Sequence, residues 1–265
     1  MSESDSKTAC VTYIATHTPD AVYVRDKSLV DELIGKLSFT EMFLLHLLGR
    51  VPSHAERVIV DAVLVTLMEH GFTPSVIAAR MVAISSPEAL QAAVAGGLLC
   101  VGSNFVGTME QSAELLSEVM NHPEGIDAGA LSVAKRYRAE RRPLPGFGHH
   151  LHRPDDPRSP RLLAVAKEAG VPGRHIAALQ ALSRAVDEVL RLHITINATG
   201  AIAAVLGEIG LEPKIMRGIA VLSRCAGLLG HIREEQQHPA ARRIWEMAEA
   251  AVEYAGSRGG RGEGA

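Results

Sequence analysis

The stretch of this chain richest in groups able to do chemistry runs from Pro145 to Arg161 and reads P-G-F-G-H-H-L-H-R-P-D-D-P-R-S-P-R. Its histidines can take up and release protons near neutral pH, and its arginines can bind carboxylates or phosphates through paired hydrogen bonds. The glycines Gly146 and Gly148 allow a tight backbone and a close approach of a ligand. The stretch therefore predicts proton transfer on a ligand that carries several negative charges.

Other chemistries fit this loop less well. The histidines and aspartates could be metal ligands, but His149-His150-x-His152 matches no standard ligand spacing, so no metal is expected. The Gly146-x-Gly148 pair lacks the third glycine of a dinucleotide fingerprint and follows no clear strand. The chain contains no G-x-S-x-G nucleophile elbow, so hydrolysis through a covalent intermediate is not expected.

Candidate residues also lie outside the loop. His70 precedes Gly71 at a predicted helix C-terminus, where the helix dipole favours an imidazolium and a lone histidine is more often a cap than a catalyst. Arg158 and Arg224 stand in apolar or Pro/Gly-rich surroundings, and Arg80 lies on a mostly apolar helix. For each arginine, a structural ion pair and a carboxylate anchor are both open interpretations.

The elements that must position these residues are predicted to be helices. Of the 265 residues 47% are hydrophobic but only 4% are aromatic, so the core must be built from Ala, Leu, Val and Ile. Capping boxes at Ser38/Glu41 and Ser53/Glu56 start two helices, of which the first ends at Gly49 and the second leads to His70-Gly71. Cap-proline pairs at 73–74, 86–87 and 159–160 indicate three more starts. Further helices are predicted at about 127–141, 174–192, 200–209, 215–232 and 239–254, and a small hairpin at 11–14 and 21–24.

Composition limits the partners and the compartment. The formal net charge of −3 gives no basic face for nucleic acid. Cys10, Cys100 and Cys225 are too far apart to indicate a disulfide framework or a metal site. The N-terminus lacks the features of a signal peptide, and no apolar run reaches the roughly 18 residues of a membrane span. A soluble cytoplasmic protein is expected, with disordered ends at 1–8 and 256–265.

Taken together, several segments resemble the citrate synthase superfamily. The loop from Pro145 to Arg158 is similar to its central active-site loop, and L-M-E-H-G places His70 where the family has a substrate histidine. S-R-C-A-G-L-L-G-H, from Ser223, is similar to the segment that carries a substrate arginine. The segments Gly97–Glu110 and Ile196–Leu206 more closely resemble the citryl-CoA lyase module of ATP-citrate lyase.

The resemblance implies an all-α fold with a large helical domain and a smaller inserted one. By analogy the small domain covers 107–203, and the flanks 1–106 and 204–265 form the large domain. The family forms homodimers whose sites lie in the cleft and are completed by the partner chain. A homodimer or higher homo-oligomer is therefore expected.

The implied chemistry is cleavage, or formation, of a C–C bond in an acyl-CoA that also carries a di- or tricarboxylic acid. The resemblance assigns His149 to the hydroxyl proton of citryl-CoA and His70 to the oxo-acid part. Arg158 and Arg224 would bind carboxylates, and Arg242 or Arg243 could be the arginine given to a partner chain. By the same resemblance, Arg153, Gly146 and Gly148 are assigned to binding the CoA part of the substrate. Coenzyme A enters as part of the substrate, and no other cofactor and no metal are implied.

Two positions depart from the family pattern. The family protonates the acetyl-CoA enolate with an aspartate, and Thr199 occupies that place in Asn197-Ala198-Thr199-Gly200. A threonine hydroxyl cannot act as a carboxylate base, and such groups contribute about 10²–10⁴ in rate. Ser103 and Asn104 replace the Asp-Arg pair of the lyase module and are assigned to substrate binding.

These departures leave three hypotheses. The chain is a citryl-CoA lyase-like C–C lyase or synthase with an altered substrate, in which another group replaces the aspartate. Alternatively, it is a different acyl-CoA enzyme on the same scaffold, or a non-catalytic homologue that binds a ligand or a partner. Fold alone does not decide among them.

Overall fold

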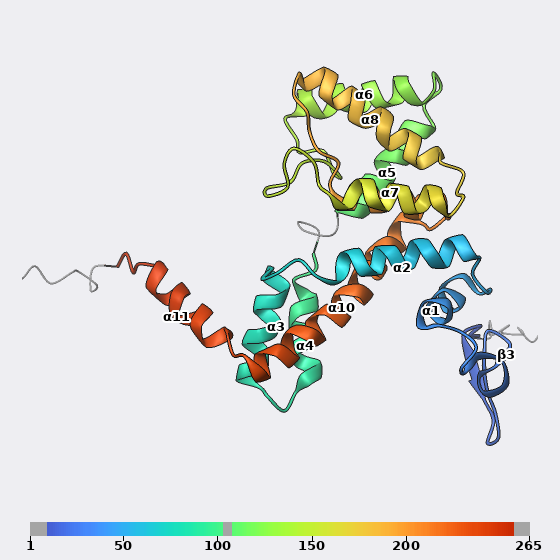
Figure 1. The fold of residues 1–265 in the computed structure, drawn as a ribbon, viewed down its shortest axis with the longest axis vertical. Helices are drawn as coiled ribbons and strands as arrows, with labels where there is room; N and C mark the ends of the chain where they lie inside the picture. Colours follow the sequence, from blue (N-terminus) through green and yellow to red (C-terminus); the bar gives the residue numbers. More distant parts are fainter. Residues whose placement is uncertain (1–9, 103–107, 257–265) are drawn as a thin grey trace, which may run out of the picture.

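The computed structural model describes residues 10–102 and 108–256 as a mostly helical fold, as predicted (Figure 1). The helices are α1 (Phe39–Leu48), α2 (His54–Met68), α3 (Pro74–Ser85), α4 (Leu90–Leu99), α5 (Thr108–Met120), α6 (Ile126–Glu140), α7 (Arg158–Glu168), α8 (Arg174–Leu190), α9 (Ala198–Glu208), α10 (Pro213–Gln237) and α11 (Ala241–Ala251). The predicted disordered end at 1–8, and most of that at 256–265, lie outside the described residues.

The helix starts agree with the capping signals in part. Ser38 and Ser53 each form a complete capping box, so α1 and α2 begin where predicted. The pair at 86–87 does not start a helix, since α4 begins only at Leu90. Helix α7 begins at Arg158, ahead of the predicted cap at Ser159. Helix α5 has no counterpart among the predicted helices.

The predicted hairpin is present but its first strand lies later in the chain. Strands β1 (Ala15–His17), β2 (Val22–Val24) and β3 (Lys27–Ser28) form a small antiparallel sheet in the order β1-β2-β3. A short π-helical turn, η1 (Leu29–Leu33), follows β3. This unit packs at one end of the molecule, away from α5–α9 (Figure 1).

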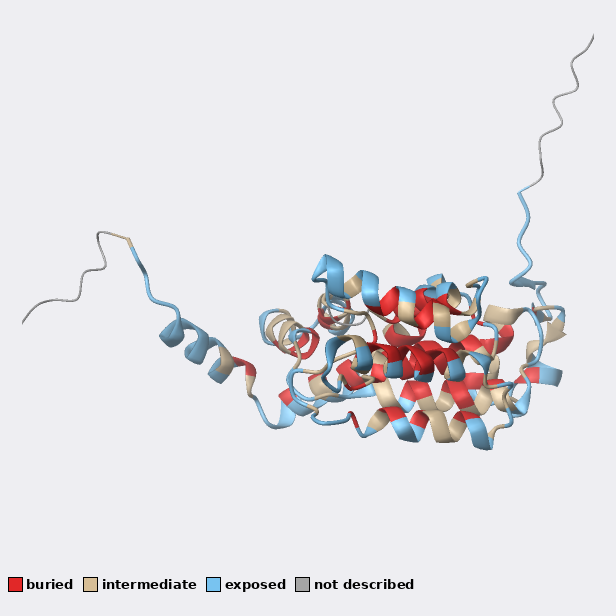
Figure 2. Cartoon of the chain, turned by 90° about the horizontal axis from the view of Figure 1, so that it is seen from above, coloured by how far each residue is buried: buried red, intermediate tan, exposed pale blue. Residues whose placement is uncertain are grey.

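Helix α9 lies at the centre of the core and is buried on nearly every side. Its sequence A-T-G-A-I-A-A-V-L-G-E is built from small and aliphatic residues, which lets α2, α5, α7 and α8 approach it closely. Figure 2 shows the buried residues concentrated in the middle of the molecule. One buried cluster joins Leu44, Leu116, Ile202 and Ile219, and therefore extends across the predicted domain boundaries. The boundary at 203/204 falls inside α9, and the division into domains stays a prediction.

The expectation that no segment is long and apolar enough to cross a membrane is wrong for helix α10. Its 25 residues contain a window of mean hydropathy 1.3, which meets that criterion by length and composition. The helix packs against α2, α3, α4 and α5, and Ile219 and Leu228 are fully buried. A central helix of a folded core passes the same test, so α10 is weak support for a membrane span.

Helix α11 projects away from the rest of the molecule (Figures 1 and 2). Ala241 is buried at its start, whereas Trp245 and Met247 farther along are more than half exposed. Isolated helices of this length are marginal in water. The position of α11 is consistent with a helix that packs against another surface.

Candidate active site

The histidine-rich loop is joined to the N-terminus of α9 by a dense set of hydrogen bonds. Gly148 N donates to Thr195 O at 2.8 Å, and Asn197 N donates to Gly146 O at 3.0 Å. The Asn197 side chain caps α9 through Oδ1 and donates through Nδ2 to Gly148 O at 2.9 Å. Two segments about fifty residues apart thus form one rigid floor that carries His149 and Thr199.

A cavity of about 580 Å³ opens above this floor. The sequence-predicted residues on its wall are His70, Gly148, His149, Arg158, Thr199 and Arg224. They come from the segment after α2, the loop, α7, α9 and α10, and only the folded chain brings them together. Apolar side chains such as Leu67 and Val101 complete the wall, so charges inside the cavity are less screened than at the surface.

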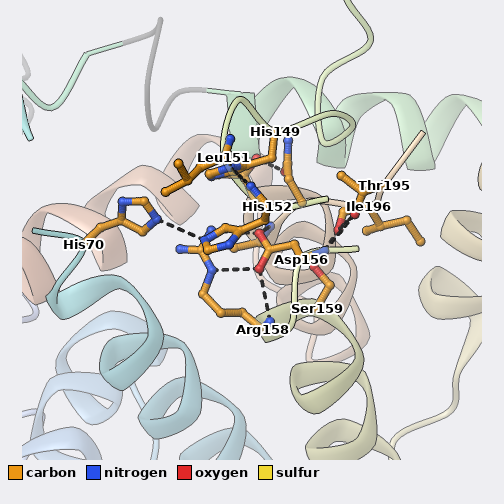
Figure 3. Close-up of polar contacts among 12 residues, drawn as sticks. His70, His149, Leu151, His152, Asp156, Arg158, Ser159, Thr195 and Ile196 are labelled. Atoms are coloured by element: carbon orange, nitrogen blue, oxygen red, sulfur yellow. Dashed lines mark hydrogen bonds and ion pairs between the residues drawn. The ribbon is translucent and has the colours of Figure 1, made fainter. Parts of the chain in front are cut away.

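His149 is held by its own loop. Its Nδ1 accepts hydrogen bonds from Leu151 N at 3.1 Å and His152 N at 3.0 Å (Figure 3). Burial, and then the neighbouring His152 and His150, lower the pKa of His149, so the ring is neutral at neutral pH. Because Nδ1 accepts, the proton of the neutral ring is assigned to Nε2. In this loop geometry His149 is a hydrogen-bond donor toward the ligand.

His70 lies just beyond α2 rather than in its last turn, because the helix ends at Met68. Glu69 Oε1 accepts from the backbone N–H groups of His70, at 2.8 Å, and Gly71. Burial and the nearby Arg158 charge lower the pKa of His70, with His152 and Arg224 acting in the same direction. The expectation of a helix-dipole-stabilised imidazolium is therefore wrong: His70 is a neutral imidazole on the cavity wall.

His152, which was weighed in the sequence only as part of the His149-His150-x-His152 pattern, lies against both of these histidines. Its Nε2 is 3.4 Å from His70 Nε2, and its ring centroid is 4.4 Å from that of His149 (Figure 3). His150 stacks on His149 at 4.7 Å but does not contact His70. The contact with His70 spans 82 residues, so local spacing could not predict it.

Arg158 is both an ion-pair partner and a cavity residue. Its Nε and Nη2 donate to the two carboxylate oxygens of Asp156 at 2.9 and 2.7 Å. Burial alone would raise the pKa of Asp156, but the hydrogen bonds from Arg158 and from Ala198 N hold it below its usual range. Asp156 thus fixes Arg158 to the start of α9, while Nη1 makes no hydrogen bond to the described residues.

Arg224, in contrast, lacks a partner for a buried N–H group. Its Nη1 is buried and has no hydrogen-bond partner among the described residues. Burial lowers the pKa of Arg224 and Glu69 opposes this, yet a guanidinium remains charged at any physiological pH. An unsatisfied charged donor on a cavity wall indicates that an anionic ligand completes it. Arg25, Arg80 and Arg217 each also have a buried Nε without a partner in the described part of the chain, but none of these three lines the cavity, and Arg80 is paired with Glu234 and Glu235.

Thr199 occupies the second position of α9 and lines the cavity. Its Oγ1 donates to Asn197 Oδ1 at 2.7 Å and lies 3.0 Å from Thr108 Oγ1 at the start of α5. Both contacts are neutral. Among the described residues that line the cavity there is no carboxylate, so none can take the place of the missing aspartate.

The remaining predicted site residues lie elsewhere. Gly146 (φ +85°) is packed against α5 and α9, where a Cβ atom would lie 2.5 Å from Ser112 Oγ, so its role is to let the loop approach α9. Arg153 is exposed and absent from the cavity wall, while Arg242 and Arg243 lie on α11, each near Glu246. Ser103 and Asn104 lie outside the described residues.

Comparisons with known proteins agree with this architecture. Residues 4–246 match the family model described as citrate synthase, C-terminal domain. The structure of citryl-CoA lyase from Hydrogenobacter thermophilus superposes with a TM-score of 0.82 at 32% identity, covering 94% of this chain and 95% of that one. ATP citrate lyase from Methanothrix soehngenii, in complex with citrate and coenzyme A, shares the fold, with a TM-score of 0.73 at 18% identity over 96% of this chain and 43% of that one.

A curated sequence relative is a protein named putative citrate synthase 2 from Mycobacterium tuberculosis. It is 29% identical over 190 residues, which are 70% of this chain and 49% of the relative. The chain spans about half the length of the curated relatives it matches. On the family match and the similarity to citryl-CoA lyase, this chain belongs to the citrate synthase family.

Proposed function

We propose that this protein is an enzyme that cleaves or forms a C–C bond in a CoA thioester, with citryl-CoA or a close analogue as its substrate. The observation that carries the proposal is the unsatisfied, buried Arg224 N–H on the same cavity wall as His70, His149 and Arg158. Two guanidinium groups suit a dicarboxylate, and the neutral imidazoles on the same wall suit an oxygen that gains and loses charge. The similarity to citryl-CoA lyase supports the same reaction class.

In the cleavage direction the substrate hydroxyl loses its proton and becomes a carbonyl. The C–C bond breaks, and its electron pair moves to the thioester fragment as an enolate. His149 Nε2–H donates a hydrogen bond to the oxygen and stabilises the alkoxide, as a neutral histidine can do. To act as the base, His149 would need its proton on Nδ1, against two backbone N–H groups. The hydroxyl proton therefore passes to a water in the cavity, which relays it toward the enolate that forms as the bond breaks.

The enolate must next gain a proton at carbon. A carboxylic acid would supply it, but Thr199 and Thr108 offer only hydroxyl groups at this place. We propose that water delivers this proton, and that Thr199 holds the water at the positive end of α9. We therefore expect either a substrate whose thioester fragment is readily protonated, or a lower rate of turnover than in relatives that have the aspartate.

The test is to incubate the protein with citryl-CoA and related 3-hydroxyacyl-CoA thioesters and to measure release of the oxo acid. Cleavage of citryl-CoA that His149→Ala abolishes is the expected result. His149→Gln should retain part of the activity, because an amide still donates a hydrogen bond but is no base. A His149→Gln variant as inactive as His149→Ala would overturn the donor role.

A different acyl-CoA enzyme on this scaffold is the second candidate, and the neutral surroundings of Thr199 favour it. Cleavage of another thioester but not of citryl-CoA would establish it. Binding of CoA without turnover of any thioester would instead indicate a non-catalytic homologue.

A further inference from the structure

Three imidazole rings from two distant parts of the chain meet at one edge of the cavity. His70 follows α2, and His149 and His152 belong to the loop; we refer to them as the three-histidine cluster (Figure 3). One ring nitrogen of each lies within 4.8 Å of the others. All three side chains are half-buried, so the cluster is partly shielded but can still be reached from solvent.

The closest pair in the cluster has the spacing of metal ligands. His70 Nε2 and His152 Nε2 are 3.4 Å apart. Two nitrogens bonded to one tetrahedral zinc ion, each at about 2.0–2.1 Å, are about 3.3 Å apart. Two nitrogen lone pairs cannot face each other at this distance, so a proton or a metal ion must lie between them.

The donor atoms also select the kind of metal. The cluster contains only imidazole nitrogens, which suit Zn²⁺, Co²⁺, Ni²⁺ and Cu²⁺ rather than Mg²⁺ or Ca²⁺. His149 Nδ1 accepts backbone N–H groups, which leaves Nε2 as its ligand atom. Three protein ligands with an open fourth position are typical of zinc sites that hold water or substrate.

Charged groups of both signs lie around the cluster. The Arg158 guanidinium, on α7, forms an ion pair with the buried Asp156 carboxylate, with 2.7 Å between Nη2 and Oδ2. Glu69, next to His70, and the cavity-facing Arg224 oppose each other in charge.

We propose that His70, His149 and His152 bind one divalent transition-metal ion, with zinc as the best match, at the edge of the cavity. The expectation from sequence spacing that the chain has no metal site misses this arrangement, because it requires His70 from outside the loop.

The site has a consequence that rests on the proposed function. A metal ion on the cluster takes the nitrogens of His70 and His149 that the C–C chemistry needs. The metal-bound state and the catalytic state therefore exclude each other, and zinc acts as an inhibitor that competes with the oxo-acid substrate.

The binding test uses metal-free protein, Zn²⁺ followed by calorimetry, and Co²⁺ followed by its visible absorption. The wild type should bind one equivalent and give the intense spectrum of four-coordinate Co²⁺. His152→Phe keeps an aromatic ring but should bind at least about 100-fold more weakly, since it lacks one ligand. The control is His150→Phe, because His150 stacks on His149 but lies outside the cluster, and its binding should match the wild type.

Circular dichroism of each variant establishes that it is folded, and His70→Gln provides a second loss of a ligand should His152→Phe misfold. Absence of stoichiometric binding to the wild type would overturn the site. So would equal binding by the wild type and both ligand variants, because another group would then hold the metal.

A second readout separates this inference from the proposed function. Zn²⁺ should inhibit thioester cleavage by the wild type, and the ratio of activity with and without zinc should approach one in His152→Phe. Metal binding without cleavage of any thioester would leave the site standing and overturn the function. Cleavage of a thioester without metal binding would support the function and overturn the metal site. Cleavage at full rate by the zinc-loaded enzyme would contradict the claim that zinc competes with the substrate.

Discussion

Arg224 is the residue whose surroundings say most about the ligand. Its buried Nη1 has no protein partner among the described residues, whereas the Arg158 guanidinium is anchored by Asp156. Under the proposed function, Arg158 is set before the ligand arrives, and the ligand itself satisfies Arg224. A charged hydrogen bond of this kind contributes about 1.5–3 kcal/mol.

We predict that Arg224→Met raises KM for the carboxylate-bearing substrate by about 10–100-fold, the equivalent of that hydrogen bond. Arg233→Met, on the exposed side of the same helix, is the matched control and should leave KM unchanged. Steady-state kinetics on the best thioester substrate checks both. A change in kcat alone for the Arg224 variant would contradict an anchoring role.

The elements around the site show which parts of the structure the sequence could predict. Capping boxes at Ser38 and Ser53 act within a few residues, and both were predictable. Helix α5 carries Met109 and Leu116 into the core but was not predicted, although Thr108-x-x-Gln111 has the spacing of a capping box. The contact between His70 and His152 was missed because it exists only when α2 and the loop pack together.

The approach of the loop to α9 depends on two glycines, and we predict that Gly200→Ala weakens it. A Cβ atom at Gly200 would overlap the carbonyl oxygen of Gly146, part of the backbone that carries His149. We expect a loss of about 1–3 kcal/mol in the free energy of unfolding, together with reduced turnover. Gly218→Ala on α10 meets only Ile215 Cδ1 at 3.8 Å and should be neutral or stabilising. Chemical denaturation measures both, and equal stability of the two variants would contradict this packing.

The start of α2 gives the fold a pH-dependent contribution. Hydrogen bonds from Arg50 lower the pKa of Glu56 from 4.5 to about 2, with Ser53 adding to the effect against burial. A lowered folded-state pKa stabilises the fold above pH 4.5, and this contribution is lost as the pH falls toward 2. Because Arg50 is largely exposed, we expect about 1–3 kcal/mol rather than the full shift.

Glu56→Gln should therefore destabilise the protein at pH 7, and the difference from the wild type should shrink as the pH approaches 2. Glu114→Gln, at an exposed position on α5, is the control and should show no such difference. Urea denaturation across this pH range is the measurement. A Glu56→Gln deficit that stays constant with pH would mean that the carboxylate charge is not its source.

At the scale of the whole molecule, α11 and the residues after it expose apolar side chains that nothing in the described part of a single chain covers. Trp245, Met247, Val252 and Tyr254 are each at least 55% exposed along this projecting segment. Apolar side chains gathered on a helix that projects into solvent are typical of an interface. We expect a homodimer in which α11 packs on a second copy, and Arg242 or Arg243 would then lie near the partner chain.

Light scattering of the wild type should give the mass of a dimer, and Trp245→Glu with Met247→Glu should shift it toward the monomer. Glu249→Ala on the same helix is the control and should leave the mass unchanged. A monomeric wild type at micromolar concentration would contradict this assignment of α11.

We propose that this cavity performs C–C chemistry on a CoA thioester without the aspartate that the family pattern has at position 199. The most direct measurement is the rate of oxo-acid release from citryl-CoA by Thr199→Asp compared with the wild type and Thr199→Val. A carboxylate at the N-terminus of α9, beside the Thr108 hydroxyl, would be well supported there. We predict a rise of about 10²-fold or more for Thr199→Asp and none for Thr199→Val. A Thr199→Asp rate equal to or below that of the wild type would contradict the account.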